Sequence, residues 1–405
     1  MRVRKNVKFL SNDEKTRFVA AVLALKAAPS VLHPGNPARS RYDDYADVHM
    51  NAMMASPGWT HRRPAFFPWH RVMLLQFEND LAAIDSSVTI PYWDWPDTAS
   101  NPFTPSFLGG DGDAADGDKV KTGPFAHDGA NGWTLNVKDN PGDPDFLQRS
   151  FGTDPTAMSL PTADDVDTAL DIDHYDASPW VNSSSGLRAN VESSLHNLVH
   201  RWVAGTMGMM TSPNDPVFWL HHCNIDRLWA VWQRLHPGAS PYLPPAGAAL
   251  GHNLMDAMIF SDGPPVPWPG TWTPASVVEH HALGYRYDDE LVLGKFDIPL
   301  AFVRVLFGVI NDAPGWVIGP DGKPHPVPGP GDPWFRLSRA DRNELAGLAI
   351  HQAAGALADK AATRQIQQIA AKLVGKRAQT MLGAKAAKPR AARAKGKGKA
   401  RPRRR

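Results

Sequence analysis

Two groups of histidines constrain this chain more than any other feature of its sequence. The first group spans 22 residues and the second spans 27 residues, and their members are His49, His61 and His70, then His196, His200, His221 and His222. Each group combines two helices, or a helix and a loop, which is how helical bundles build metal sites from inward-pointing side chains. One such histidine is ordinarily a core residue with satisfied hydrogen bonds, but seven in two compact groups predict metal binding.

The segments that carry these histidines have helical periodicity. The pattern predicts five helices, over residues 12–27, 42–54, 68–84, 187–203 and 216–236. Residues 96–180 are rich in Gly, Pro and Asp, and predict ordered loops with short helices or strands. Within them, residues 109–118 (GGDGDAADGD) suggest calcium, but without the closing glutamate of an EF-hand we favour a plain acidic loop. The fold class is therefore mainly α, with long ordered loops.

The spacing within the second group restricts which histidines share an ion. His196 and His200 are four residues apart and lie on one helical face, with Glu192 one turn earlier. The adjacent pair His221 and His222 cannot both reach the same ion, because successive helical residues diverge by ~100°. Helical geometry alone leaves the choice between these two open.

The ligand type indicates which metal is bound. Imidazoles without matching carboxylates or thiolates suit copper or zinc rather than magnesium, calcium or manganese. Three neutral ligands leave coordination positions open, which is typical of a reactive ion rather than a structural one. A pair of redox-active copper ions would support oxygen chemistry, whereas zinc would support only hydrolysis. The residues favour copper and leave a zinc hydrolase as the alternative.

Two long motifs resemble those of a known family. Residues 61–80 (HRRPAFFPWHRVMLLQFEND) are similar to the first copper-binding signature of tyrosinases, and residues 212–229 (SPNDPVFWLHHCNIDRLW) to the second. Shorter matches occur at 91–95 (PYWDW), 195–205 (LHNLVHRWVAG) and 283–287 (LGYRY). The resemblance covers residues 3–288 and points to bacterial tyrosinases and polyphenol oxidases.

This resemblance implies a type 3 dicopper centre in a four-helix bundle, with dioxygen as co-substrate. The matching positions assign one copper to His49, His61 and His70, and the other to His196, His200 and His222. The implied reaction is hydroxylation of a monophenol beside its hydroxyl group, oxidation of an o-diphenol to an o-quinone, or both. An o-aminophenol oxidase and a non-catalytic, haemocyanin-like oxygen carrier are the alternatives with the same centre.

The resemblance also implies roles for residues around the coppers. Asn197 matches an asparagine that positions a water, and Glu192 resembles its glutamate partner in drawing a proton from a monophenol. Glu192 departs from the family pattern by lying only four residues before His196. Substrate entry is expected to be shaped by Arg201, Met207, Gly208 and Met210, with Phe218 packed against an imidazole. Asp226 is expected to be structural, and Cys223 to be a buried, unreacted thiol.

The rest of the chain suggests three parts: a dicopper domain over residues 1–288, a C-terminal extension over 289–383 and a disordered tail over 384–405. The extension is a possible lid over the site or an interaction segment. Residues 385–405 contain eleven lysines and arginines and no acid. The positive charge of this segment alone exceeds the formal net charge of the whole chain, which is +2. Such a tail cannot form a core, and it is expected to be solubilising or to bind an anionic partner.

Composition also limits location and cofactor class. The single cysteine excludes internal disulfides and cysteine-based zinc or iron–sulfur sites. Residues 1–15 resemble neither a signal peptide nor a membrane span, and other apolar runs are too short to cross a bilayer. We therefore expect a cytoplasmic protein, with export alongside a partner protein as the alternative.

Overall fold

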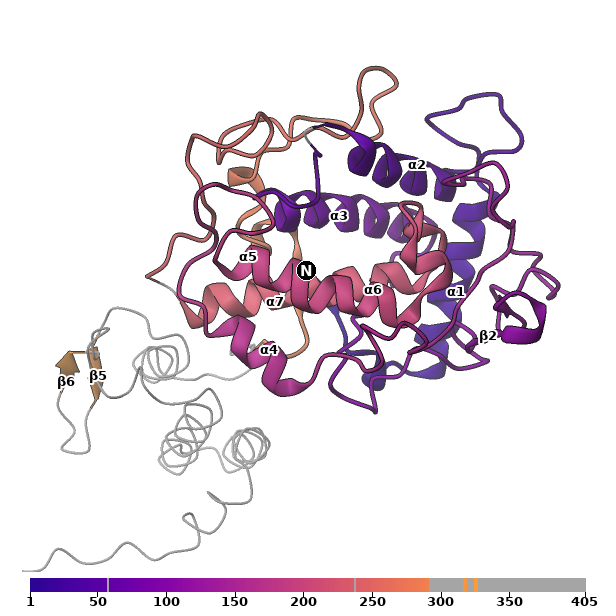
Figure 1. The fold of residues 1–405 in the computed structure, drawn as a ribbon, viewed down its shortest axis with the longest axis horizontal. Coiled ribbons are helices and arrows are strands. Elements are labelled where there is room, and N and C mark those ends of the chain that lie inside the picture. The colour runs from indigo at the N-terminus through magenta and orange to yellow at the C-terminus, as the bar shows by residue number, and fades with distance from the viewer. Residues whose placement is uncertain (57, 237, 291–315, 319–323, 327–405) are drawn as a thin grey trace, which may run out of the picture. The chain divides into compact units, whose positions relative to one another are not determined.

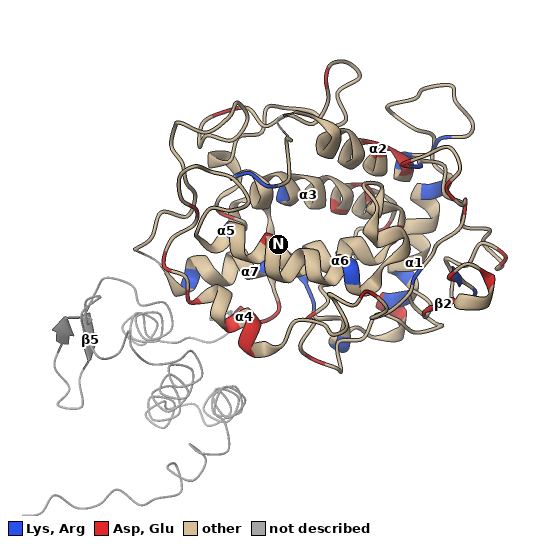
Figure 2. Ribbon diagram, viewed as in Figure 1, with Lys and Arg blue, Asp and Glu red and all other residues tan. Residues whose placement is uncertain are grey.

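The computed structural model describes residues 1–56, 58–236 and 238–290, together with two short strands, 316–318 and 324–326. The predicted tail and nearly all of the predicted extension therefore lie outside the described residues. The two short strands, β5 (Trp316–Ile318) and β6 (Pro324–Pro326), pair with each other in antiparallel orientation. In the described part of the chain, acidic and basic side chains are interspersed (Figure 2).

The described domain is mainly helical, as predicted, and three of its long helices, α2, α3 and α7, run in similar directions while α1 crosses at their side (Figure 1). They are α1 (Asn12–Ala27), α2 (Arg41–Met54), α3 (Phe66–Ile84) and α7 (Val217–Leu235). Capping boxes start two of them: Ser11 with Glu14 at α1, and Ser40 with Asp43 at α2. Helix α3 packs against α1 and α7. Among the described residues, no helix is long and apolar enough to cross a membrane.

The predicted helix over residues 187–203 is interrupted. It consists of α5 (Leu187–Asn190), a π-helical segment η3 (Val191–His196) and α6 (Asn197–Val203). A π-helical turn holds one residue more than an α-helical turn, and such turns are frequent at functional sites. The interruption changes the direction in which side chains before and after it point. Sequence periodicity does not reveal it, because both halves are helical.

Ordered loops and short elements complete the domain. They are η1 (Val7–Phe9), β2 (Gly112–Asp113), η2 (Ala114–Asp116), β3 (Lys119–Val120), α4 (Ala163–Leu170), η4 (Gly205–Gly208), η5 (Ser212–Asn214), η6 (Ala275–Val277) and η7 (His281–Leu283). Strands β2 and β3 pair in antiparallel orientation within the acidic loop, where Lys121 pairs with Asp113 and Asp116. Buried Arg149 fixes this region by a bidentate ion pair with Asp215, just before α7.

Aromatic side chains pack α2, α3 and α7 together. The rings of Phe77 and Trp219 stack with their centroids 3.6 Å apart, and Tyr42 meets both rings edge-on. The Tyr42 hydroxyl accepts a hydrogen bond from Trp219 Nε1 (3.0 Å) and donates one to the Pro213 carbonyl (2.7 Å). A fully buried aromatic cluster with satisfied polar groups is rigid, so these helices present their histidines from fixed positions.

Asp226 is the centre of a buried polar network, which supports the structural role predicted for it. Strands β1 (Arg2–Arg4) and β4 (Tyr285–Tyr287) pair in parallel and bring both ends of the domain to α3 and α7. The Asp226 carboxylate accepts hydrogen bonds from Arg71 (2.5 Å), Arg4 (3.1 Å), Tyr285 (2.6 Å) and Tyr287 (2.5 Å). Burial alone would raise the pKa of Asp226, but the two guanidinium groups hold it below its usual value.

Candidate metal centre

The fold brings the predicted histidines together in two groups. His49 is on α2, His70 in the first turns of α3, and His61 in the loop between them. In the second group, His196 ends the π-helical segment, His200 is on α6, and His221 and His222 are on α7. Within each group, the nearest ligand atoms of all members lie within 4.8 Å of one another.

Distances inside the groups match those of imidazoles that share an ion. The Nε2 atoms of His49 and His61 are 3.2 Å apart, and those of His200 and His222 are 3.4 Å apart. Two nitrogens at ~2.0–2.1 Å from one ion in a tetrahedral arrangement lie roughly 3.3 Å apart. The separation therefore leaves room for an ion between each pair.

The opposite ring nitrogen of most of these histidines is held by an acceptor. This holds for His49, His70, His196 and His200, whose Nδ1 atoms lie 2.7 Å from the Met210 carbonyl, 2.8 Å from the Phe66 carbonyl, 2.9 Å from Asn197 Oδ1 and 2.6 Å from the Met207 carbonyl. Such partners fix the tautomer with a proton on Nδ1 and leave Nε2 free for a metal. The buried Nε2 atoms of His70 and His196 accordingly have no hydrogen-bond partner among the described residues.

Burial keeps these imidazoles neutral. It lowers the pKa values of His49, His70, His196 and His222 well below their usual range, and neighbouring histidines add to the effect. Burial also lowers the pKa of His200 to about 4. Neutral imidazole is the form that binds metal, so the chemistry of the donor set fits two metal ions.

The two groups face each other. The rings of His70 and His222, one from each group, stack with their centroids 4.3 Å apart, and those of His61 and His196 are 5.4 Å apart. Phe218 packs on His222 with a centroid distance of 4.0 Å, which confirms the predicted contact. The arrangement is that of a dinuclear centre rather than two independent sites.

The geometry does not exclude His221 as a ligand of the second metal ion. It is fully buried, its ring stacks on His196 at 5.2 Å, and neither of its nitrogens has a hydrogen-bond partner among the described residues. Its ligand atom also falls within the second group. Cys223, which comes directly after the pair, is a free and buried thiol, as expected.

The loop that carries His61 is held by Glu192. The Glu192 carboxylate is buried, accepts hydrogen bonds from the Arg62 backbone N–H (2.5 Å) and from Arg188 (3.0 Å), and lies 3.3 Å from His61 Nδ1. Arg62 itself has a positive φ of 60°, a conformation that costs energy for a residue other than glycine. Glu192 therefore compensates for that strain and orients His61 at the same time.

His252 holds the two ends of the same loop, and the sequence gives no signal for it. Its Nε2 lies 2.9 Å from the Gly58 carbonyl, and its Nδ1 accepts a hydrogen bond from the Ala65 N–H (3.4 Å). Burial lowers the pKa of His252 to about 4, so the ring is neutral and its tautomer is fixed by these two contacts. His252 is isolated in a proline-rich segment, where no spacing rule connects it with the other histidines.

The residues predicted to shape substrate entry differ in exposure. Arg201 and Gly208 are exposed, and Arg201 donates a hydrogen bond to Thr156. Met210 is partly buried, whereas Met207 is fully buried.

The backbone N–H groups of Met210 and Thr211 donate to the carboxylate of Asp139 (2.7 and 2.9 Å). Asp139 thus fixes the carbonyl that anchors His49, a role that no motif indicates.

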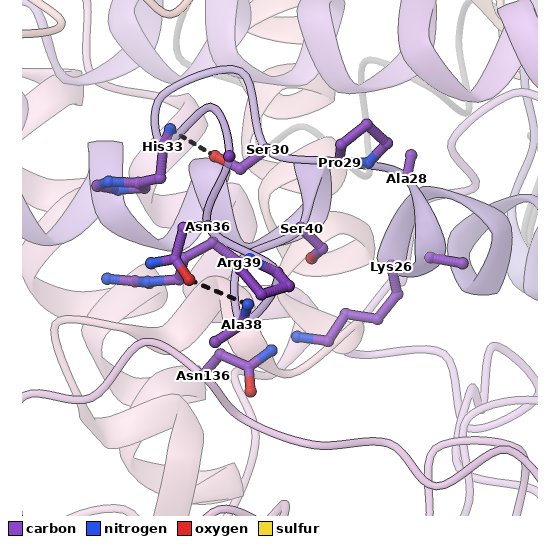
Figure 3. A pocket seen from close by; sticks show the side chains of 13 residues that line it. Lys26, Ala28, Pro29, Ser30, His33, Asn36, Ala38, Arg39, Ser40 and Asn136 are labelled. Carbon is purple, nitrogen blue, oxygen red and sulfur yellow. Dashed lines mark hydrogen bonds between the residues drawn. The ribbon is translucent and has the colours of Figure 1, made fainter.

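A hollow of about 370 Å³, lined in part by His33, lies beside the loop between α1 and α2 and includes none of the histidines of the two groups (Figure 3). Its polar lining includes Lys26, Asn36, Arg39 and Asn136. Lys26 and Asn136 both donate to Asp43, and Arg39 pairs with Asp47. Three of these four polar groups are thus paired with the acidic side chains of α2.

Fold and site together define a helical protein with a histidine-bound dinuclear metal centre. Residues 39–235 match the common central domain of tyrosinase. The tyrosinase of Streptomyces glaucescens is 43% identical over 302 residues, which cover 72% of this chain and 100% of that protein. The grixazone synthase of Streptomyces griseus is 36% identical, covering 71% and 99%. A polyphenol oxidase structure from Thermothelomyces thermophila has a TM-score of 0.53 at 25% identity, covering 71% and 88%.

The chain belongs to the tyrosinase family. Members of this family use two copper ions and dioxygen, and the two histidine groups fit such a pair. The identity of the metal, which the ligand types alone left between copper and zinc, is therefore copper.

Proposed function

We propose that this chain oxidises phenols with dioxygen at a dicopper centre held by His49, His61 and His70 and by His196, His200 and His222. The observation that carries the proposal is the two facing groups of imidazoles, with Nε2 pairs 3.2 and 3.4 Å apart. The copper pair supplies the redox chemistry that converts dioxygen and a phenol into an o-quinone and water. Copper also distinguishes this centre from that of a zinc hydrolase.

The protein's own residues position the ligands. The carbonyls of Met207, Met210 and Phe66 hold three imidazoles in one tautomer, so little reorganisation is needed when metal binds. Asn197 orients His196 in the same way. We propose that Arg201, Met207, Gly208, Met210 and Phe218 border the path of the phenol, with Met210 as an adaptable thioether at the entrance.

The test is a comparison of tyrosine, L-DOPA and o-aminophenol as substrates of copper-loaded protein, with metal content measured on the same sample. We expect two coppers per chain and turnover of at least the o-diphenol. An oxygen-dependent absorption change without turnover of any of the three would instead indicate an oxygen carrier. Preference for o-aminophenol would favour the aminophenol oxidase, and zinc with no oxidase activity would contradict the proposal.

Glu192→Gln tests whether the carboxylate acts as a base or as an orienting group. We propose orientation, since Glu192 already interacts with Arg188, Arg62 and His61. The variant is then expected to weaken copper retention by ~10–100-fold and to lower tyrosine and L-DOPA turnover together. If Glu192 instead draws a proton from the monophenol, tyrosine turnover falls alone and copper retention is unchanged. Asn197→Ala, measured in parallel, shows whether the two residues act as the pair that the family resemblance implies.

His252→Phe removes both contacts that hold the ends of the His61 loop while filling a similar volume. We expect copper to be lost to a competing chelator ~10–100-fold more readily, because the ligand His61 becomes less well ordered. The matched control is His174→Phe, at a partly exposed histidine that interacts with Asp173 and Ser185. Equal copper retention in both variants would show that His252 has no part in positioning the ligand.

We propose that the predicted extension covers the copper site and that its removal raises o-diphenol turnover. The cut belongs after Glu290 rather than after Asp288, because Asp289 pairs with Arg227 and Glu290 with Arg234. We expect the shortened chain to fold, since the aligned 72% of this protein covers the whole length of a relative. Unchanged or lost turnover in a folded, copper-loaded product would contradict the lid. An anionic partner for the basic tail and the cytoplasmic location stay predictions.

A further inference from the structure

A third cluster of metal-binding side chains lies at the end of the described domain, away from the dicopper centre. His280 and His281 meet Glu290: their Nε2 atoms lie 2.7 and 2.6 Å from its two carboxylate oxygens. One ligand atom from each of the three residues lies within 4.8 Å of the other two. The two imidazoles thus contact different oxygens of one carboxylate, and all three side chains lie close enough together to reach one ion.

The backbone creates this convergence locally. His281 starts the short helix η7, His280 lies just before it as the N-cap residue, and Gly284 ends it in the left-handed conformation (φ 89°). Strand β4 comes next, and a turn with a hydrogen bond from the Glu290 N–H to the Tyr287 carbonyl (3.2 Å) returns Glu290 to the histidines. Strand β4 pairs with β1, so both sides of the cluster are anchored in the domain.

A second carboxylate lies behind the two rings. Glu279 Oε1 is 3.4 Å from His281 Nδ1 and 3.7 Å from His280 Nδ1. The Nδ1 of His280 is buried and has no hydrogen-bond partner among the described residues. Histidines that bind metal through Nε2 usually present Nδ1–H to a carboxylate or carbonyl, and Glu279 is placed to serve both rings.

We propose that His280, His281 and Glu290 form an accessory site for a divalent cation of the zinc type. Two imidazoles and one carboxylate suit such borderline metals, and water would complete the coordination. On binding, the proton on Nε2 of each ring moves to Nδ1, which lies 3.4 Å (His281) or 3.7 Å (His280) from Glu279 Oε1, and Nε2 becomes a ligand. No proton or electron is gained or lost in this tautomer change.

The charges near the site are compatible with a cation. Arg234 donates to Glu290 Oε1 (3.1 Å), and this fixes the carboxylate while its second oxygen stays available to a metal. Glu279 and Glu290 together carry one more negative charge than Arg234 compensates. His281 is 46% exposed in its side chain, so a cation can enter from solvent without opening the domain.

A cation at the proposed site would cross-link two segments of the chain. Glu290 is the second residue of the predicted extension, and a cation would tie it to the residues that precede β4. Because a cation that binds only the folded chain stabilises it by mass action, zinc is expected to raise the Tm. The site would thus fix the point at which the C-terminal part of the chain leaves the domain.

The test uses the full-length, copper-loaded chain dialysed against zinc, with both metals measured in the same sample. We expect one zinc per chain in addition to the copper already present, and a higher Tm than without zinc. The variant His281→Ala, at the exposed ligand, is expected to bind zinc at least tenfold more weakly and to lose the rise in Tm. Glu290→Gln tests the carboxylate in the same assay.

The matched control is His174→Ala, which removes a histidine of similar exposure far along the sequence. It should bind zinc and copper as the unchanged protein does. The proposal is overturned if no zinc binds beyond exchange with copper, or if His281→Ala and Glu290→Gln both bind zinc as tightly as the control. Copper content, measured throughout, shows whether any loss of zinc reflects a misfolded variant.

Discussion

Replacing His222 by alanine is expected to leave one copper per chain and to reduce o-diphenol turnover by at least a thousandfold. A copper with two imidazoles in place of three is held weakly, and oxidation by dioxygen at this centre needs both ions. His222 is assigned because its Nε2 lies 3.4 Å from that of His200 and its ring faces His70 at 4.3 Å. Metal content and L-DOPA oxidation, measured on the same sample, give the result.

The adjacent histidine provides a matched control. His221 is equally buried, and its ring lies between His196 and Trp95. His221→Phe preserves this packing and removes both ring nitrogens, so we expect two coppers to be retained. If His221→Phe loses a copper and His222→Ala does not, the assignment of the ligands must be reversed.

Asp226→Asn is expected to reduce the free energy of unfolding by about 3–5 kcal/mol, the usual cost of leaving a buried charge without its partner. Asp226 is the only acid that pairs with Arg71 among the described residues, and Arg71 is fully buried. The asparagine keeps the shape of the side chain but not its charge. Urea-induced unfolding of the variant and the unchanged protein measures the difference.

The control for this variant is Asp97→Asn, which breaks a partly exposed ion pair with Lys8. Solvent screens such a pair, so the loss is expected to stay below about 1 kcal/mol. Copper content should also fall in Asp226→Asn, because Asp226 lies one turn after His222 on the same helix. Similar unfolding curves for both variants would show that the buried network contributes little.

Most of the helices and the grouping of the histidines could be predicted from the sequence, because both depend on short-range spacing. The helix predicted over residues 42–54 ends where α2 ends and starts one residue later than α2 does. The choice between His221 and His222 came from the family resemblance, since both histidines lie beside the second group. Spacing cannot decide between neighbours whose rings are both buried at the same centre.

The groups that hold the ligands in place could not be predicted. Asp139 and His252 act on backbone atoms of distant loops, and such contacts depend on the three-dimensional course of the chain rather than on motifs. Glu192 was singled out by its place before His196, but its contact with the His61 loop depends on the π-helical turn. The third cluster was visible only as two adjacent histidines, with its glutamate nine residues further on.

The π-helical turn also has a consequence for how one helix can serve two metal ions. In an uninterrupted α-helix, Glu192, His196 and His200 would lie in one row and face a single target. One extra residue in the turn shifts the phase of the residues before it by ~100° relative to the residues after it. Glu192 then supports a ligand of one copper, while His196 and His200 belong to the other. One extra residue in the turn is thus enough for a single helix to support a ligand of one copper and to provide two ligands of the other.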